Sequence, residues 1–333
     1  MKAFEFDHQL INAYEHFSRS FSTIRASDLS AEVNAQYDAG RFWPDALLSL
    51  NPRFLAGPTV DELVISNDLD EGTGCVFRFG EEPLRLHKHQ AEAIAKAKSG
   101  KSFVVTTGTG SGKSLCFFVP VVDAIIRARR AGKPRRTKAI IVYPMNALAN
   151  SQMKEIDKFI AQSGLPEDIK PVVKRYTGQE SQEDRKRIAS NPPDILLTNY
   201  MMAELLLTRQ DDLDAKVVGN ATGLEFIILD ELHTYRGRQG ADVAVLVRRL
   251  RDRCCADNAP ICIGTSATMA SEGSDEGRAL AVSKVASRLF GAEIGPDAVI
   301  DESLQRATDD SLKSEKLLGA LGEAITHPFP DTL

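Results

Sequence analysis

The sequence predicts an α/β fold in which a parallel sheet lies between helices. Three observations support this prediction. From Leu84 onward, short apolar and β-branched runs alternate with stretches of helical spacing, which is typical of a parallel sheet with crossover helices. A glycine-rich turn follows one of these runs, and a pair of carboxylates follows another. Because ligands of such sheets collect where the strands end, these two turns mark the expected functional edge.

The composition is that of a globular protein. The chain has 333 residues, enough for one large or two ordinary domains, with 43% hydrophobic and 26% charged residues. No apolar run approaches the roughly 18 residues of a membrane helix, and the start of the chain lacks the profile of a secretion signal. We therefore expect a cytoplasmic protein without a membrane partner. The five cysteines show no metal-ligand spacing, so reduced thiols are expected.

Residues 1–82 are predicted to form a small, mainly helical accessory segment. Leu10 to Phe21 carries apolar residues at helical spacing, and Ser27 with Asp28 could cap a second helix before a stretch rich in proline and glycine turns. The periodic aromatic residues are interpreted as core, and the alternative is a platform on which nucleic-acid bases stack.

Residues 83–290 are predicted to form the main domain. Helices are expected within Leu115 to Ile126, Ala147 to Ile160 and Ala241 to Leu250, and residues 291–333 are expected to be a tail or the start of a linker. The expected strands are Ser102 to Thr107, Lys138 to Tyr143, Pro171 to Tyr176, Asp194 to Thr198, Glu225 to Asp230 and Pro260 to Thr265.

Charge does not predict a polyanionic partner. The formal net charge is −5, so nucleic-acid binding would have to depend on local motifs. The basic stretch Arg127 to Lys138 is interpreted as a solvated loop, and contact with phosphates is the alternative.

The stretch Thr106 to Ser114 predicts a phosphate-binding loop between a strand and a helix. Its glycines let successive backbone N–H groups point into one concavity, and the following helix adds partial positive charge. Lys113 would reach the β- and γ-phosphates, and the Ser114 hydroxyl would bind Mg²⁺. Thr107 stands where the strict motif has glycine, so a glycine- and serine-rich surface loop is the alternative.

A carboxylate pair follows the apolar strand Phe226 to Leu229. Asp230 would hold Mg²⁺ through water, while Glu231 would orient and deprotonate the attacking water. The alternative is that the pair only caps the next helix. Farther along, the stretch Gly264 to Thr268 follows another strand, and its small hydroxyl residues, among them Ser266 and Thr268, could bond to these carboxylates and report the state of the γ-phosphate, unless they belong to an ordinary turn.

Taken in order, these motifs resemble the first RecA-like domain of superfamily 2 helicases of the DEAD/DEAH-box type. The resemblance implies a P-loop NTPase fold, with Gln90 reading adenine and His233 coupling nucleotide state to nucleic-acid movement. Position 107 need not be glycine in this family. The residues implied to bind ATP are Gln90, Thr107, Gly108, Thr109, Gly110, Ser111, Gly112, Lys113 and Ser114.

Three further loops resemble motifs with which this family contacts the backbone of one nucleic-acid strand. They are Tyr143 to Leu148 with Gln152, Tyr176 to Gln179, and Leu197 to Tyr200. Such contacts use backbone amides, helix N-termini and hydroxyls, so they need no strongly basic surface. The residues implied to make them are Pro144, Asn146, Gly178, Thr198 and Asn199.

The stretch after the carboxylates resembles a particular branch of the family. Thr234 to Gly237, with Gly240, is similar to MrfA-like and Lhr-like DNA helicases and to related phage-defence helicases. Leu232 departs from the Ala or Val that the family usually has. The arginines that follow are interpreted as a solvated helix face, and nucleic-acid contact is the alternative; they are Arg248, Arg249, Arg251 and Arg253.

The resemblance covers residues 84 to about 290 and implies an ATP- and Mg²⁺-dependent motor acting on nucleic acid, with single-stranded DNA as the expected partner. Family members also use a second RecA-like domain that supplies arginine fingers, which nothing in residues 291–333 resembles. Losing such a finger costs about 10³ to 10⁵ in turnover, so we expect an amino-terminal fragment with weak activity. The alternative is a nucleotide-sensing scaffold module bound to partner proteins of a defence or repair complex. A double-strand translocase shares every motif.

Overall fold

A computed structural model describes residues 3–21, 23–44, 53–108, 110–209, 211–255, 258–267 and 275–305. Its contacts divide the chain into two compact units, Met1–Pro52 and Arg53–Leu333. The predicted division into residues 1–82, 83–290 and 291–333 remains a prediction. No helix within the described ranges is long and apolar enough to cross a membrane.

The first unit contains α1 (Ala3–Arg19) and α2 (Ser27–Asp38). The Tyr37 hydroxyl of α2 donates to Ser18 Oγ of α1 at 2.9 Å, and the Arg19 guanidinium lies over the Tyr37 ring. Ser27 and Asp28 lie within the first turn of α2, so they do not cap it as predicted: the residue before the helix is Ala26, which forms no side-chain cap. Phe17 and Phe21 remain exposed, so the interpretation of these periodic aromatic residues as core is wrong within this unit.

The second unit is built on a seven-stranded sheet in the order β11-β5-β10-β9-β6-β8-β7, in which every pair is parallel. This confirms the predicted α/β class and the six predicted strands, with ends that differ by one or two residues. The seventh strand, β11, was not predicted, because it is only three residues long. The strands are β5 (Phe103–Thr106), β6 (Ala139–Tyr143), β7 (Val173–Tyr176), β8 (Ile195–Asn199), β9 (Phe226–Leu229), β10 (Ile261–Ser266) and β11 (Val299–Asp301).

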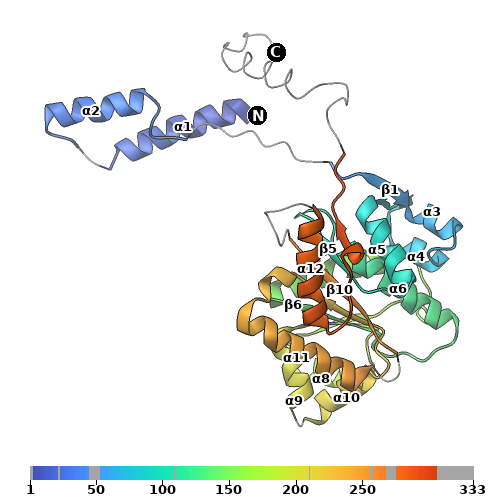
Figure 1. Cartoon of the computed structure of the whole chain (residues 1–333). Coiled ribbons are helices and arrows are strands. Elements are labelled where there is room, and N and C mark those ends of the chain that lie inside the picture. The colour runs from blue at the N-terminus through green and yellow to red at the C-terminus, as the bar shows by residue number, and fades with distance from the viewer. Residues whose placement is uncertain are drawn as a thin grey trace. The chain divides into compact units, whose positions relative to one another are not determined.

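Helices cover the sheet. In Figure 1, α5 and α6 lie side by side, as do α11 and α12. The three helices predicted by spacing are confirmed as α6, α7 and α11. The helices that accompany the sheet are α5 (Lys88–Lys98), α6 (Leu115–Arg130), α7 (Asn146–Gln162), α8 (Gln182–Ser190), α9 (Tyr200–Thr208), α10 (Asp212–Asn220), α11 (Gly237–Cys254) and α12 (Asp275–Phe290), with short η1 (Leu232–Thr234) and η2 (Pro296–Ala298).

A smaller layer precedes α5. β1 (Ala56–Thr59) pairs antiparallel with β4 (Arg85–His87), and a short hairpin of β2 (Arg78–Phe79) and β3 (Glu82–Pro83) lies between them in sequence. Thr59 and Glu62 form a capping box that begins α3 (Val60–Ile65), after which α4 (Glu71–Val76) follows. The pairing of β1 with β4 fixes the point at which α5 begins.

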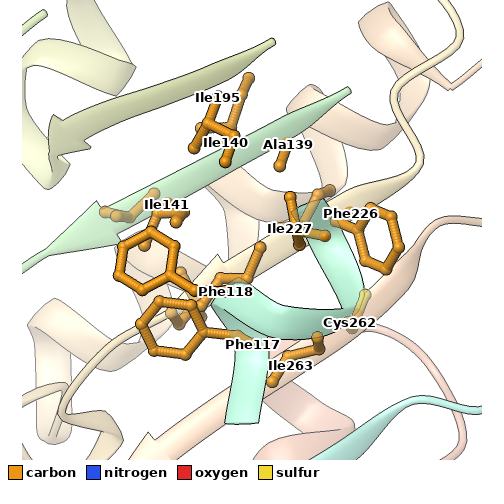
Figure 2. Packing of buried hydrophobic residues seen from close by; sticks show 14 of the residues in the cluster. Phe117, Phe118, Ala139, Ile140, Ile141, Ile195, Phe226, Ile227, Cys262 and Ile263 are labelled. Atoms are coloured by element: carbon orange, nitrogen blue, oxygen red, sulfur yellow. The ribbon is translucent and has the colours of Figure 1, made fainter. Parts of the chain in front are cut away.

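The core lies on both faces of the sheet. β5, β6 and β9 are buried along their whole lengths, as expected for parallel strands covered on both sides. Phe117 and Phe118 of α6 pack near the apolar side chains of three strands, among them Ile141, Ile227 and Ile263 (Figure 2). This packing fixes α6 against β6, β9 and β10.

The basic stretch Arg127 to Lys138 is not simply a solvated loop. Its first four residues belong to α6, and the side chains of Arg129 and Lys138 are only 11% and 5% exposed. Arg129 bonds to the buried Asp194 at 2.5 Å, and Lys138 pairs with Glu225. The interpretation as a solvated loop is wrong for Arg129 and Lys138, because the carboxylates of Asp194 and Glu225, which lie far along the chain, neutralise their charges.

Candidate nucleotide-binding site

The three predicted active-site motifs meet at one edge of the sheet. β10 lies between β5 and β9, with Ser266 opposite Thr106 and Gly264 opposite Leu229. Since parallel strands end at the same edge, the phosphate loop, the Asp230–Glu231 pair and Ser266 are brought together. Thr109 and Thr268 lie outside the described residues.

The phosphate loop connects β5 to α6. Gly110 and Gly112 have φ of 81° and 71°, a left-handed conformation that glycine adopts at little cost. The Thr107 and Ser111 hydroxyls lie 2.6 Å apart, and Lys113 Nζ donates to the carbonyl oxygens of Thr107 and Gly108 at 2.9 and 3.1 Å. The ammonium group therefore lies over the loop in which a phosphate would be bound.

The start of α5 braces this loop from one side. Gln90 is 2% exposed; its Nε2 donates to the carbonyls of Gly112 at 3.0 Å and Ser111 at 3.3 Å, and its Oε1 accepts from the His87 amide. His89 Nε2 lies 3.0 Å from the same Ser111 oxygen, and burial lowers the pKa of His89. Gln90 is thus engaged within the protein, and its predicted contact with adenine remains a prediction.

The carboxylate pair follows β9. Asp230 accepts a hydrogen bond from the Thr265 hydroxyl, and burial raises its pKa. Glu231 has φ of 54°, which is costly for a residue with a side chain, and its amide donates to Thr265 Oγ1 at 3.2 Å. Strained backbone of this kind gathers at functional sites, so the residue predicted as the base stands out structurally as well.

His233 connects the carboxylates to β10. Its Nδ1 lies 3.2 Å from Glu231 Oε2 and 3.3 Å from Ser266 Oγ, and Ser266 is fully buried. A shift of Glu231 or of Ser266 would therefore also displace the other residue, because the His233 ring contacts both.

The donor set suits a magnesium ion. Ser114 is the residue immediately before α6, and its hydroxyl makes no capping bond. Asp230 is a half-buried carboxylate that directly follows β9 at the same sheet edge. Hydroxyl and carboxylate oxygens are ligands that Mg²⁺ accepts, with phosphates and water completing its shell. Within the described part of the chain, no group of three or more His, Cys, Asp or Glu forms a protein-only metal site.

Gly264 belongs to the motif that contains Ser266, but the packing role that it has in the structure was not predicted. A Cβ atom at this position of β10 would lie 2.4 Å from Leu232 Cδ1 and 3.3 Å from Phe290 Cε2. Gly264 therefore makes room for Leu232, the residue that departs from the family's usual Ala or Val. A glycine inside a strand pattern, which often marks a close approach, was the available signal.

Replacing Gly264 with alanine is expected to lower the free energy of unfolding by about 1–3 kcal/mol, because the new methyl overpacks against Leu232. Leu232→Ala alone should cost about 2–5 kcal/mol through a cavity. The double substitution should cost clearly less than the sum, as measured by urea unfolding. Gly219→Ala, in open space on α10, is the control and should cost nothing. Additive effects at 264 and 232 would contradict the account.

The loops predicted to contact nucleic acid also lie together. Asn199 Nδ2 donates to Asn146 Oδ1 at 2.5 Å and to the Thr177 carbonyl at 3.1 Å, and its Oδ1 caps α9. Gly178 has φ of 86°, and Pro144 is half-buried. The Thr198 hydroxyl is buried against the Tyr176 carbonyl. Contact of these residues with a strand remains a prediction.

Three of the four predicted arginines of α11 have partners on neighbouring helices. Arg248 donates to the Arg288 carbonyl and Arg251 to the Phe290 carbonyl, at 3.1 and 3.0 Å, and Arg249 pairs with Glu204. Arg248, Arg249 and Arg253 are exposed and the opposite apolar face of α11 is buried, so the predicted solvated face is confirmed for these three residues. The bonds of Arg248, Arg249 and Arg251 also hold α11 to α12 and α9, which was not predicted.

The fold and the site define a RecA-like core whose phosphate loop and carboxylate pair lie at the carboxyl edge of a parallel sheet. A model of the DEAD/DEAH box helicase family matches residues 87–276. The chain belongs to this family.

Several proteins are similar to this chain. YprA of Bacillus subtilis, described as an uncharacterized ATP-dependent helicase, is 33% identical over 186 residues, which cover 56% of this chain and 23% of YprA. The ATP-dependent helicase HRQ1 of Saccharomyces cerevisiae is 29% identical over 182 residues, covering 53% and 15%. The crystal structure of the DUF1998 helicase MrfA bound to DNA superposes with a TM-score of 0.58 at 27% identity, covering 76% and 29%. The matches thus span less than a third of each relative.

Proposed function

We propose that this chain is the ATP-binding part of an ATP-dependent helicase or translocase that acts on DNA. The observation that carries the proposal is that the phosphate loop with Lys113, the Asp230–Glu231 pair and Ser266 lie at one sheet edge, at the ends of the neighbouring strands β5, β9 and β10. The similarity to proteins named as ATP-dependent helicases, and to a helicase crystallised with DNA, supports it.

The proposed chemistry is hydrolysis of the γ-phosphate of ATP. The loop amides and Lys113 would hold the phosphates, while Ser114 and Asp230 would hold Mg²⁺, Asp230 through water. The metal ion would neutralise charge that develops on the phosphate oxygens. Glu231 would accept the proton of the attacking water, and Gln90 would position the base end of the nucleotide from α5.

Coupling to nucleic acid would pass through His233. The ring touches both Glu231 and Ser266, so loss of the γ-phosphate would be transmitted from the carboxylates to β10. A single DNA strand would lie along the loops of Asn146, Gly178 and Asn199, held by its sugar-phosphate backbone without sequence preference.

Full activity would need parts beyond the core described here. Since the chain spans less than a third of its relatives, we propose that residues 291–333 lead toward a second RecA-like domain that closes the site. The isolated chain would then bind Mg²⁺–ATP weakly and turn it over slowly, because an arginine finger contributes about 10³ to 10⁵ in rate. Roles in DNA repair or phage defence, with partner proteins in either, belong to this proposal.

The test is the ATPase rate of the full-length natural protein with and without single-stranded DNA, with Lys113→Ala as the control for contaminating enzymes. We expect stimulation by DNA that the control abolishes. Stable complexes with partner proteins and no DNA-dependent ATPase in any of them would instead favour the scaffold alternative.

A further inference from the structure

Two acidic residues at the end of the core's last strand contact the phosphate loop: Asp301 ends β11, and Glu302 follows it. β11 pairs in parallel with β5, with Asp301 opposite Thr106. The Thr106 hydroxyl donates to Asp301, and the Gly108 amide donates to Glu302 Oε2 at 2.8 Å. A Cβ on Gly108 would lie 3.3 Å from the same carboxylate oxygen, so the glycine permits this close approach. Glu302 thus occupies a backbone donor of the phosphate loop.

The residues that follow Glu302 are tied to the start of the second unit. The Leu55 amide donates to the Ser303 carbonyl at 2.7 Å, and the Gln305 amide donates to the Arg53 carbonyl at 2.6 Å. Between these bonds, Phe54 and Leu304 form an antiparallel bridge. Residues 303–305 and 53–55 are therefore held as a short two-stranded ribbon.

This ribbon is also hydrogen-bonded to the start of α5, which contacts the phosphate loop from another side. The Lys88 amide, at the start of α5, donates to the Leu55 carbonyl at 2.9 Å. In the same first turn of α5, His89 bonds to the Ser111 carbonyl and Gln90 donates to the Gly112 carbonyl. The loop is thus held by its Gly108 amide on one side and by its carbonyls on the other, and both supports join at Leu55.

A carboxylate and a triphosphate would compete for the backbone amides of this loop. Loop amides are the donors that hold phosphate oxygens, and charge-assisted bonds from amides to anions are the strong ones. Two anions side by side also repel each other. Glu302 on the Gly108 amide is therefore expected to disfavour a phosphate nearby, and a bound phosphate is expected to disfavour Glu302.

We propose that Glu302 is a positioning residue of the nucleotide site that opposes the triphosphate. Entry of a nucleoside triphosphate displaces the Glu302 carboxylate from Gly108 and loosens the ribbon of residues 303–305 and 53–55. The segment that leaves the core after β11 thereby responds to nucleotide occupancy. This inference rests on the proposed function, because it requires the loop to bind a nucleotide.

The first test measures equilibrium binding of a non-hydrolysable ATP analogue with Mg²⁺ to the chain. Glu302→Gln keeps the shape of the side chain and removes its charge, so it should lower the Kd by about 3- to 10-fold. Glu293→Gln removes an equal charge from an exposed position and should leave the Kd unchanged. Equal affinities in the wild-type chain and Glu302→Gln would overturn the inference.

The second test measures hydrogen exchange at the Leu55 and Gln305 amides, which are donors within the ribbon. The analogue should accelerate exchange at both in the wild-type chain, and Glu302→Gln should show faster exchange before any analogue is added. If neither the analogue nor the Glu302→Gln substitution alters the exchange rates of these two amides, the inference is overturned. A wild-type chain that does not bind the analogue overturns the proposed function and this inference with it, whereas binding that is insensitive to Glu302 overturns the inference alone.

Discussion

Replacing Glu231 with glutamine is expected to lower the DNA-stimulated ATPase rate of the full-length protein by about 10²- to 10⁴-fold. The amide cannot take the proton of the attacking water, although it has nearly the same shape as the carboxylate. Glu231 suits this role because its amide is fixed by Thr265 and its carboxylate lies 3.2 Å from His233. The measurement is a steady-state phosphate-release assay at saturating ATP and single-stranded DNA.

Nucleotide binding should survive this substitution, because Glu231 is not proposed to hold the phosphates or the metal directly. Glu183→Gln, on the exposed face of α8, is the matched control and should keep the full rate. A Glu231→Gln protein that hydrolyses ATP as fast as the control would show that another group is the base.

Replacing Arg185 with alanine is expected to lower the free energy of unfolding of the chain by about 3–5 kcal/mol. Arg185 of α8 donates to the buried Asp214 of α10 at 2.8 Å and to the Tyr176 hydroxyl of β7 at 2.9 Å, and that hydroxyl in turn donates to Asp214. Asp214 is fully buried, so removing the guanidinium leaves a charge without its counterion.

Chemical denaturation of Arg185→Ala beside Arg187→Ala would check this expectation. Arg187 lies on the same helix with its side chain 78% exposed, 3.8 Å from Asp184, so its loss should change stability by less than about 0.5 kcal/mol. If the two substitutions had equal effects, the buried network of Tyr176, Arg185 and Asp214 would not be the stabilising element that its burial indicates.

The parts of the fold that the sequence predicted are those with continuous local signals. β6 and β9 are unbroken apolar runs, and a parallel sheet buries such runs on both faces. The active-site motifs were predictable for a related reason: each is contiguous, and parallel strands bring their ends to one edge. The three residues of β11 were too few to give such a signal.

Contacts between distant segments could not be predicted in the same way. The bond between Gly108 and Glu302 joins residues 194 apart in sequence, and no local pattern marks Glu302. The basic stretch after Arg127 looked solvated because Asp194, which neutralises Arg129, lies far along the chain. Gly264 and Leu232 are 32 positions apart, so their fit appears only when β10 lies beside β9.

Titration of the chain with a fluorescent ATP analogue and Mg²⁺ shows whether the phosphate loop binds a nucleotide. We expect saturable binding that Lys113→Ala weakens by about 10- to 150-fold, the cost of losing a hydrogen bond to a charged group. Lys133→Ala, which removes the same charge from an exposed loop position, should bind as the wild-type chain does. Binding that is equal in all three chains would contradict the account.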